Sequence, residues 1–523
     1  ILSIPAYTQM GRDVSLREAL ESITLLKNDG NILPLDESKV HTIAVIGPDA
    51  WPAVPGGGGS SEVTPFQASS IMTGLSDYLG KRANVLYARG LPTAKEVFTA
   101  TRFVDDSGKP GNKAVKVEVF DNHNFSGTPQ VSYESRLVGY HPEDSWLALK
   151  QTKGYRFTTH FMPETTGSYM VLATAVGRDS YTVTVNGKKI LAQPNTGDRQ
   201  YPLSADLTFT ANQPVTVQVD YIPAAAQARF SLGIRPMSDI ITPDVAKLAS
   251  MADAAVVAVG FGPSTEAEGS DRSYQLPWGQ EELIEAVSAA NKKTIVTLTA
   301  GGGVATANWI NKVPVFLHNF YPGEEGGKAF AEILFGQHSP EGHLPFSFAK
   351  SWEQNPTHDN YYPAPHAPGQ TPHVKYAEGV YVGYRYYTTK HVEPLFPFGY
   401  GLSYTTFRFS NLKVSPETAS ADGPITVSFD VTNTGQRKGA EVAQLYVGDP
   451  SAKIDRPVKE LKGYKKVRLE PGKSEHVTLI LHRRSLAYWD TASNNWRVDP
   501  GKFVVYVGDS SEHTPLEANF EVR

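Results

Sequence analysis

The chain has 523 residues, which is enough for about three domains of roughly 150 residues each. Hydrophobic residues make up 40% and charged residues 20% of the sequence, and the net charge is −5. This balance gives no electrostatic reason to expect nucleic acid or a membrane surface as a partner, and the absence of cysteine excludes disulfides, thiolate metal sites and cysteine nucleophiles.

The first elements predict the start of an α/β unit. SLREALESITLLK (15–27) repeats its apolar residues at helical spacing, and turn residues follow it. TIAVI (42–46) is a short β-branched run that predicts a buried strand. The same alternation of strands and helices returns over 245–350, so we expect a mostly parallel sheet covered by helices.

Two other parts of the chain have the period-two pattern of β-strands. VKVEVF, GYRFTTHF, GSYMVLATAV, SYTVTVNGKKIL and VTVQVDYI occur within 97–236, and a second run of short strands closes the chain. The strands before 97 are too few to form a core alone, which favours an insertion over three consecutive domains. The fold class is therefore multidomain α/β plus all-β, an α/β sandwich with an inserted β-sandwich and a terminal β-sandwich.

The predicted domain bounds follow from these changes of pattern. The segments are 1–96 (α/β sandwich domain, first part), 97–236 (inserted β-sandwich), 237–350 (α/β sandwich domain, second part), 351–405 (a connector rich in Pro, Tyr and His) and 406–523 (terminal β-sandwich).

The sequence shows neither a membrane-spanning run of about 20 apolar residues nor a signal-peptide pattern. It begins at Ile1 without an initiator methionine. We therefore expect a processed product or one piece of a longer polypeptide.

Two glycine-rich stretches invite a nucleotide-binding interpretation. GGGGSS (56–61) lacks the lysine of a phosphate-binding loop, and Gly260-Phe261-Gly262 lacks the third glycine of a dinucleotide fingerprint. The fourteen histidines have no metal-ligand spacing. We expect no cofactor and no metal.

An acidic loop follows the predicted strand 254–259. It contains Glu266, Glu268, Gly269, Asp271 and Arg272, and it lies where α/β sheets usually carry function. In an extended chain, residues 266 and 268 point to opposite sides, so one of them faces a given cleft. We expect a local salt bridge between Asp271 and Arg272, and a glycine at 269 that permits close backbone approach. Most such carboxylate clusters are solvated, so composition alone leaves the role of the loop open.

Several motifs occur together in a characteristic order. They are ESITLLKNDGNILPL, IAVIGPDA, GGGGSSEVTP, AEGSDRSYQLP, NFYPGEEGGKAFAEILFGQHSPEGHLPFSF and FPFGYGLSYTTF. This set resembles the non-barrel half of glycoside hydrolase family 3. The resemblance implies a retaining exo-β-glycosidase built from a (β/α)8 barrel, an α/β sandwich and a fibronectin type III-like domain. The insert, with PETTGSYMVLATAVGRDSYTVTVNGKKIL, resembles a protective-antigen-type domain.

The resemblance also implies roles for the acidic loop. Retaining hydrolysis needs two carboxyl groups roughly 5 Å apart, one a nucleophile and the other a general acid/base. In the family, the nucleophilic aspartate comes from the barrel and the acid/base glutamate from a motif like Glu-Gly-x-Asp-Arg, which maps onto Glu268. Some members set the glutamate further from the glycine, which would select Glu266 instead. Gly269, Asp271 and Arg272 are then structural residues at the site.

For two other pairs of candidate residues, the sequence leaves a functional and a structural role to be weighed. Trp51 and Phe66 flank GGGGSS and either line an aglycone subsite or pack in the core. Glu324 and Glu325 precede a helical pattern, which favours capping of that helix.

The sequence therefore predicts the C-terminal part of a secreted or periplasmic β-glycosidase, with β-glucosidase preferred over β-xylosidase. Its expected partners are a β-linked oligosaccharide or aryl glycoside and a barrel polypeptide that carries the nucleophile, and neither nucleic acid nor a membrane. The alternative from another class is a non-catalytic carbohydrate-binding or scaffold chain.

Overall fold

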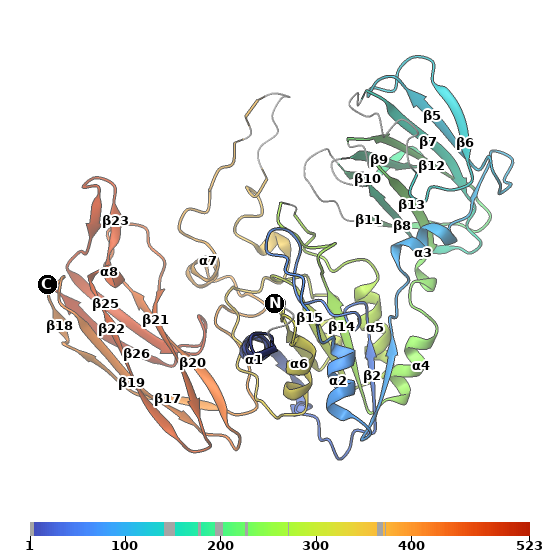
Figure 1. Ribbon diagram of the computed structural model, residues 1–523. Helices are drawn as coiled ribbons and strands as arrows, with labels where there is room; N and C mark the ends of the chain where they lie inside the picture. The colour runs from blue at the N-terminus through green and yellow to red at the C-terminus, as the bar shows by residue number, and fades with distance from the viewer. Residues whose placement is uncertain are drawn as a thin grey trace.

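The computed structural model describes residues 5–140, 152–175, 179–193, 202–224, 228–269, 271–362, 370–371 and 373–523. Figure 1 shows three bodies along the chain, with an α/β body in the middle, an all-β body on one side and a second all-β body at the C-terminus on the other. The fold class predicted from the sequence is confirmed.

The central body is built on a six-stranded sheet. Its strands lie in the order β1-β16-β15-β14-β2-β3. They are β1 (Thr24–Asn28), β2 (Thr42–Ile46), β3 (Asn84–Ala88), β14 (Ala254–Gly260), β15 (Thr294–Thr299) and β16 (Val315–His318). All neighbours are parallel except β1, which pairs antiparallel with β16. The expected mostly parallel sheet is thus confirmed.

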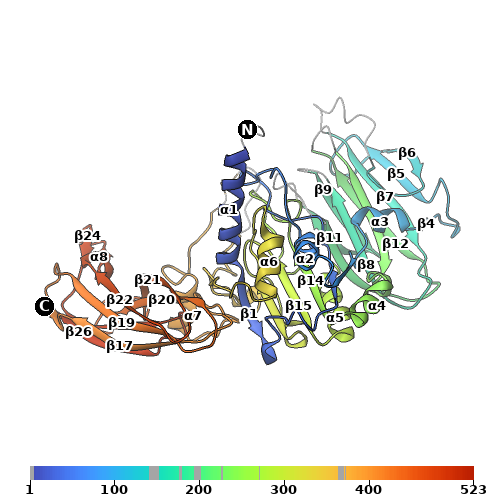
Figure 2. The same ribbon diagram turned by 60° about the horizontal axis from the view of Figure 1, so that its bottom comes forward.

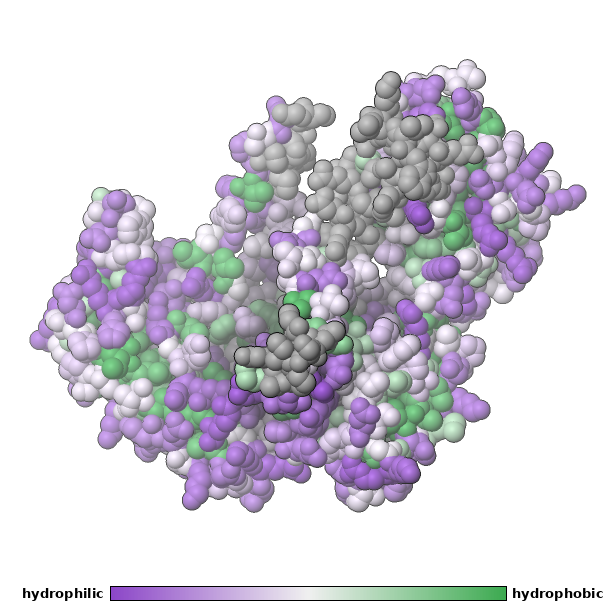
Figure 3. Space-filling view, in the orientation of Figure 1, coloured by the Kyte–Doolittle hydropathy of each residue, from purple (hydrophilic) through white to green (hydrophobic). Residues whose placement is uncertain are grey.

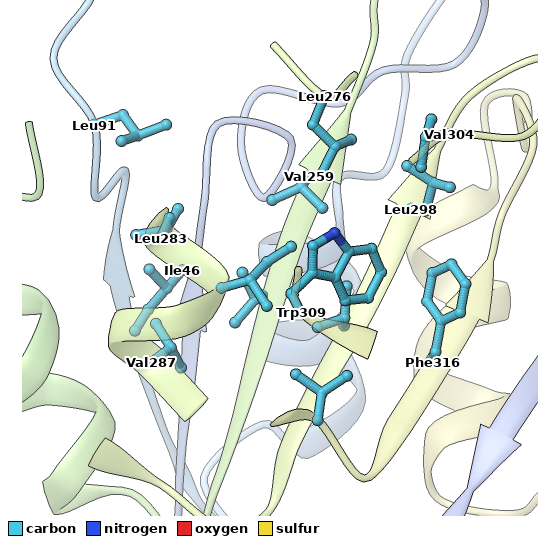
Figure 4. Packing of buried hydrophobic residues seen from close by; sticks show 14 of the residues in the cluster. Ile46, Leu91, Val259, Leu276, Leu283, Val287, Leu298, Val304, Trp309 and Phe316 are labelled. Carbon is cyan, nitrogen blue, oxygen red and sulfur yellow. The ribbon is translucent and has the colours of Figure 1, made fainter. Parts of the chain in front are cut away.

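Helices cover both faces of this sheet, as Figures 1 and 2 show. One face carries α1 (Pro5–Ser22), α2 (Ile71–Leu79) and α6 (Gly326–Leu334), and the other carries α4 (Asp244–Met251) and α5 (Gln280–Ala290). On the second face, Trp309 meets Phe316 edge to face at 5.1 Å between ring centroids, among the aliphatic side chains that Figure 4 shows. A core on each face explains why the strands are apolar on both sides.

The predicted N-terminal helix over 15–27 is partly wrong. The helix α1 ends at Ser22, and the next residues form β1. Thr24 and Leu25 are fully buried and pair with β16, although leucines favour helices. Tertiary burial at the sheet edge therefore outweighs the local propensity.

The insert consists of antiparallel strands in two packed sheets. One sheet has the order β10-β9-β12-β7-β5-β6 with β4 beside β7, and the other has the order β11-β8-β13. The strands are β4 (Phe103–Val104), β5 (Val115–Phe120), β6 (Gln130–Glu134), β7 (Gly154–Phe161), β8 (Gly167–Ala175), β9 (Ser180–Val185), β10 (Lys188–Gln193), β11 (Leu203–Phe209), β12 (Val215–Ile222) and β13 (Phe230–Pro236). Their inward residues form one aromatic-rich core.

Two sequence details of the insert can be followed in the structure. Asn186 and Gly187 form the turn between β9 and β10 with φ of 48° and 78°, as a tight hairpin requires. Val176, the last residue of one predicted strand, lies outside the described residues. Residue 97, where the insert is predicted to begin, lies in α3 (Ala94–Ala100), a helix that packs against β13. The protective-antigen-type assignment stays a prediction.

The C-terminal body is a second β-sandwich. Its sheets have the orders β17-β19-β22 and β18-β26-β25-β20-β21, and β23 and β24 form a separate hairpin. The elements are β17 (Phe407–Ser415), β18 (Thr418–Ala419), β19 (Ile425–Asn433), β20 (Gly439–Gly448), β21 (Glu460–Leu469), β22 (Ser474–Leu481), α8 (Arg483–Leu486), β23 (Tyr488–Asp490), β24 (Asn495–Arg497), β25 (Gly501–Gly508) and β26 (Leu516–Val522).

The segment between the α/β body and this sandwich has little regular structure. It contains the helix α7 (Tyr384–Lys390), whose first tyrosine hydroxyl accepts a hydrogen bond from the backbone N–H of Leu461 at 2.8 Å. Lys466 of β21 also pairs with Glu341 at 3.0 Å, which joins the sandwich to the α/β body.

Figure 3 shows hydrophilic residues over much of one face of the molecule, with hydrophobic residues in separate groups between them. Within the described ranges, no helix combines the length and the apolar character that a membrane span requires.

Candidate active site

The acidic loop lies at the point where the strand order of the sheet reverses, between β2 and β14. From β2 the chain passes through α2 to β3 on one side, whereas from β14 it passes through α5 to β15 on the other side. Because β2 and β14 are parallel neighbours, the loops that follow them, 47–70 and 261–279, leave the same sheet edge and diverge. Such a switch point at the carboxyl ends of strands is where open α/β sheets bind ligands.

The two loops are joined by backbone hydrogen bonds. The N–H of Gly58 donates to the carbonyl of Glu266 at 2.9 Å, and the N–H of Glu268 donates to the carbonyl of Gly58 at 3.3 Å. Gly59 has φ of 95°, and a Cβ there would lie 2.5 Å from the Cβ of Glu268. The glycines of GGGGSS therefore let the backbone approach the acidic loop, a role that sequence reasoning missed when it rejected phosphate binding.

Glu266 points into the fold and is held by three donors. Its carboxylate accepts hydrogen bonds from Arg272 Nε at 2.8 Å, from the backbone N–H of Gly301 at 2.9 Å and from the Tyr321 hydroxyl at 2.6 Å. Burial favours the neutral acid, but the charge of Arg272 and these donors outweigh it and hold the pKa of Glu266 below its usual value. Glu266 is thus an ionised anchor of the loop.

Arg272 does not pair as the sequence suggested. The expected salt bridge to Asp271 is wrong, because the Arg272 guanidinium binds Glu266 and donates to the carbonyl of Gly303 at 3.0 Å. It also lies over the ring of Phe261, 4.5 Å from the centroid. Because the planar guanidinium carries several donors, it also donates to the carbonyl of Ser273 at 3.1 Å, and it thus serves this ring and three acceptors at once.

Asp271 instead connects the loop to the later connector. Its carboxylate accepts a hydrogen bond from the Tyr361 hydroxyl at 2.9 Å. Gly269 has φ of 77°, with open space where a Cβ would be, so backbone conformation and not close approach explains this glycine. Ser270, between them, lies outside the described residues.

The loop around Gly301 is held by a hydrogen bond to His318, which is fully buried at the end of β16. Its Nδ1 accepts from the backbone N–H of Phe320 at 3.0 Å, so Nε2 carries the hydrogen that it donates to the carbonyl of Gly302 at 3.2 Å. Burial lowers the pKa of His318 to about 4, which keeps the ring neutral. Sequence reasoning assigned no role to this histidine.

Glu268 points away from Glu266, as the alternation of an extended chain predicts. It is exposed, and its Oε2 accepts hydrogen bonds from the backbone N–H of Ser60 at 2.9 Å and from the Ser60 hydroxyl. These two bonds, the hydroxyl first, lower the pKa of Glu268. Of the two candidate glutamates, Glu268 is therefore the one that a ligand can reach, whereas Glu266 is occupied by its protein partners.

The two candidate aromatic residues lie at the surface. Trp51 is 51% and Phe66 60% exposed, so the alternative of core packing is wrong for both. Trp51 meets Tyr87 edge to face at 6.3 Å between ring centroids. Both rings belong to the loop that contains GGGGSS, and so to the same sheet edge as Glu268.

For Glu325, the predicted capping of α6 by a side-chain hydrogen bond is also wrong. Glu325 occupies the N-cap position of α6, but no side-chain capping bond forms there. The Glu325 carboxylate, which is nearly buried, pairs with Arg12 of α1 instead. It therefore ties two helices of one sheet face together.

A buried aspartic acid, Asp49, lies at the same sheet edge, in the loop that follows β2. The Oδ2 atom of Asp49 is buried without a hydrogen-bond partner, and it lines a cavity of about 20 Å³ with Asn319, whose Oδ1 also has none. This volume is close to that of one water molecule. Burial raises the pKa of Asp49 to about 8, against a weaker opposing effect from Arg89.

The raised pKa predicts a pH dependence of stability. Between about pH 4 and pH 8 the folded chain holds a proton on Asp49 that the unfolded chain has released, so the free energy of unfolding falls as the pH rises through this window. Asp49→Asn, which is neutral at every pH, should raise the free energy of unfolding by ~2 kcal/mol or more at pH 8 and leave it nearly unchanged near pH 4. Urea denaturation of both proteins at the two pH values measures this, and an identical pH dependence would contradict it.

Among the described residues, no group of three His, Asp or Glu side chains could hold a metal ion.

The chain is similar to known β-glucosidases over nearly its whole length. It is 34% identical to a beta-glucosidase of Rhizobium radiobacter, with 94% of this chain and 60% of that protein covered. It is 33% identical to a probable beta-glucosidase I of Emericella nidulans, with 97% and 62% covered. The chain therefore spans about 60% of the length of these relatives.

Solved structures show the same extent of similarity. A beta-glucosidase from Kluyveromyces marxianus in complex with glucose matches with a TM-score of 0.65 and 30% identity, covering 98% of this chain and 62% of that one. DesR, a beta-glucosidase from Streptomyces venezuelae in complex with D-glucose, matches with a TM-score of 0.67 and 29% identity, covering 98% and 60%.

The family comparison agrees with the domain architecture. Residues 23–404 match the glycosyl hydrolase family 3 C-terminal domain, and residues 441–511 match a fibronectin type III-like domain. Taken with the fold and the two joined loops, these matches show that the chain belongs to glycoside hydrolase family 3.

Proposed function

We propose that the chain is the part of a retaining, exo-acting β-glucosidase that supplies the general acid/base, and that Glu268 is this group. The observation that carries the proposal is the different environment of the two glutamates. Glu266 is bound by three donors, whereas Glu268 is exposed at the sheet edge and, among the described side chains, is hydrogen-bonded to Ser60 only. A group that exchanges protons with substrate must be reachable by it.

The proposed mechanism needs a second carboxylate, which acts as the nucleophile. Retaining enzymes place the nucleophile and the acid/base roughly 5 Å apart, and the nucleophile forms the covalent glycosyl intermediate. At the two loops, Glu266 and Asp271 are engaged by Arg272 and Tyr361, which makes them poor nucleophiles. We infer that the nucleophile lies on a barrel domain outside these 523 residues.

The ionisation state of Glu268 in this chain is consistent with a nucleophile on another domain. The Ser60 hydrogen bonds lower its pKa and favour the carboxylate, which suits a base but not an acid. A second carboxylate placed nearby would raise the pKa, because two like charges disfavour each other. In the complete site, Glu268 would then hold the proton needed for leaving-group protonation.

The substrate proposed is a terminal β-linked glucose residue on a short oligosaccharide or an aryl glycoside. The names of the similar proteins support glucose over xylose, and β-xylosidase activity within the family is the second candidate. Trp51 and Phe66 supply exposed rings at the correct edge to stack on the leaving sugar. A secreted or periplasmic location remains part of this proposal.

A mixing experiment tests the proposal against a non-catalytic scaffold role. Because covalent catalysis requires the nucleophile, the purified chain alone should not hydrolyse nitrophenyl β-glucoside, and activity should return when a barrel domain of the same protein is added. Nitrophenyl β-xyloside serves as the comparison substrate. Hydrolysis by the purified chain alone would overturn the proposal that the nucleophile lies on a separate barrel domain. Glycan binding without turnover after mixing would favour the scaffold role.

A further inference from the structure

The contact between Glu268 and Ser60 is unsymmetrical. Both donors of Ser60, its backbone N–H and its hydroxyl, bind the same carboxylate oxygen, Oε2. Within the described part of the chain, Oε1 has no hydrogen-bond partner. The two oxygens of Glu268 therefore differ before any substrate arrives.

This difference decides where a proton can be held. A backbone N–H can only donate, and in a neutral carboxylic acid the carbonyl oxygen is a better acceptor than the hydroxyl oxygen, so the Ser60 N–H favours Oε2 as the carbonyl oxygen. A proton on Oε1 leaves both Ser60 contacts intact. The neutral acid is therefore expected to carry its proton on Oε1, the oxygen that remains open.

The position of Ser60 is itself fixed by the two-loop junction. Gly58 is hydrogen-bonded to both Glu266 and Glu268, and Gly59 adopts a φ of 95° so that the chain turns directly over Glu268. The direction of the Ser60 N–H is thus fixed by the backbone conformation of the Gly-rich loop and by the hydrogen bonds that join this loop to the acidic loop. A donor that is held in this way orients its acceptor without reorganisation during the reaction.

We propose that Ser60 is a positioning residue for Glu268, holding Oε2 with two donors so that Oε1 is presented as the atom that exchanges the proton with substrate. The role in catalysis depends on the proposed function of Glu268, whereas the contact and its effect on the carboxyl group do not.

Few other charges compete with this effect. Besides Glu268, the titratable or charged groups on the two loops that meet here are Asp49, Glu62, Glu266, Asp271 and Arg272. Glu266 and Arg272 are paired with each other, and Asp271 binds Tyr361. The lowered pKa of Glu268 arises from the Ser60 hydroxyl and then the Ser60 N–H.

The first experiment uses this chain and requires no activity. In protein labelled with carboxyl-¹³C glutamate, the Glu268 signal is assigned by its loss in Glu268→Gln and titrated by NMR. Its pKa should lie below the ordinary glutamate value and rise by ~0.5–1 unit in Ser60→Ala, which lacks one of the two donors. Ser60→Thr, which keeps the hydroxyl at an exposed position, should titrate like the wild type.

The second experiment uses the complete enzyme. The alkaline limb of the pH profile of kcat/KM for a disaccharide should move upward in Ser60→Ala by the shift that NMR measures, and Ser60→Thr should restore it. Ser60→Ala should have no further effect in a Glu268→Gln background, because the group that it positions is absent.

The outcomes separate the two proposals. An unchanged Glu268 titration in Ser60→Ala, or an equal effect of this substitution with and without Glu268, overturns the role of Ser60. If Ser60→Ala shifts the titration as expected but Glu268→Gln leaves activity intact, the contact stands, and the assignment of Glu268 as acid/base and with it the catalytic role of Ser60 are wrong.

Discussion

In the complete enzyme, Glu268→Gln should reduce the turnover of a β-linked disaccharide by roughly 10²- to 10⁴-fold. The glutamine keeps the size of the side chain and can still accept from Ser60 through its carbonyl oxygen, but it cannot give a proton to the departing sugar oxygen. A dinitrophenyl glycoside should be affected far less, because its leaving group departs with little protonation. Steady-state kinetics on both substrates measure the difference.

Added azide provides an independent check of the same variant. With no base to activate water, the glycosyl intermediate should accumulate, and a small anion that needs no deprotonation should restore turnover by attacking it. Glu266→Gln is the matched control, with a smaller loss that is the same for all leaving groups. If the leaving-group dependence and the azide rescue occur at residue 266 instead, the assignment is wrong by two positions. Their absence from both variants would make the loop structural.

Glu266→Gln should have its largest effect on the stability of the α/β body. All three groups that contact the Glu266 carboxylate are donors, so the amide of a glutamine would face at least one of them with another donor. The charge of Arg272 would also lose its partner. Both side chains are mostly buried, at 22% and 15% exposed, and we expect a loss of about 2–3 kcal/mol in the free energy of unfolding.

The loss of stability in Glu266→Gln can be measured for the whole chain and at a single backbone amide. Urea denaturation of the chain gives the change in stability, and amide hydrogen exchange at Gly301, whose N–H donates to Glu266, should become faster. Glu268→Gln is the control, since its exposed side chain contacts only surface groups and should change the stability by less than about 1 kcal/mol. Equal stabilities of the two variants would contradict the anchoring role of Glu266.

The architecture could be predicted because it follows from local patterns. Runs such as Ala254–Gly260 are apolar at every position, which indicates a strand buried on both faces, and the insert alternates with period two because each strand has one inner face. The error at residues 24–28 has the opposite cause. Nothing local distinguishes TLLKN from the end of a helix, and its burial beside β16 decides the outcome.

By itself, the sequence determined the fold class, the family resemblance and the loop that carries the candidate acid/base, because spacing and residue type are local properties. The choice between Glu266 and Glu268 was left open by the sequence, and the partner of Arg272 was predicted wrongly. The tertiary structure placed Gly301 and Tyr321, which are 35 and 55 residues from Glu266, around its carboxylate, and it placed Ser60, 208 residues away, on Glu268. Hydrogen bonds between such distant segments depend on how the strands are ordered in the sheet, and that order is a property of the folded chain as a whole.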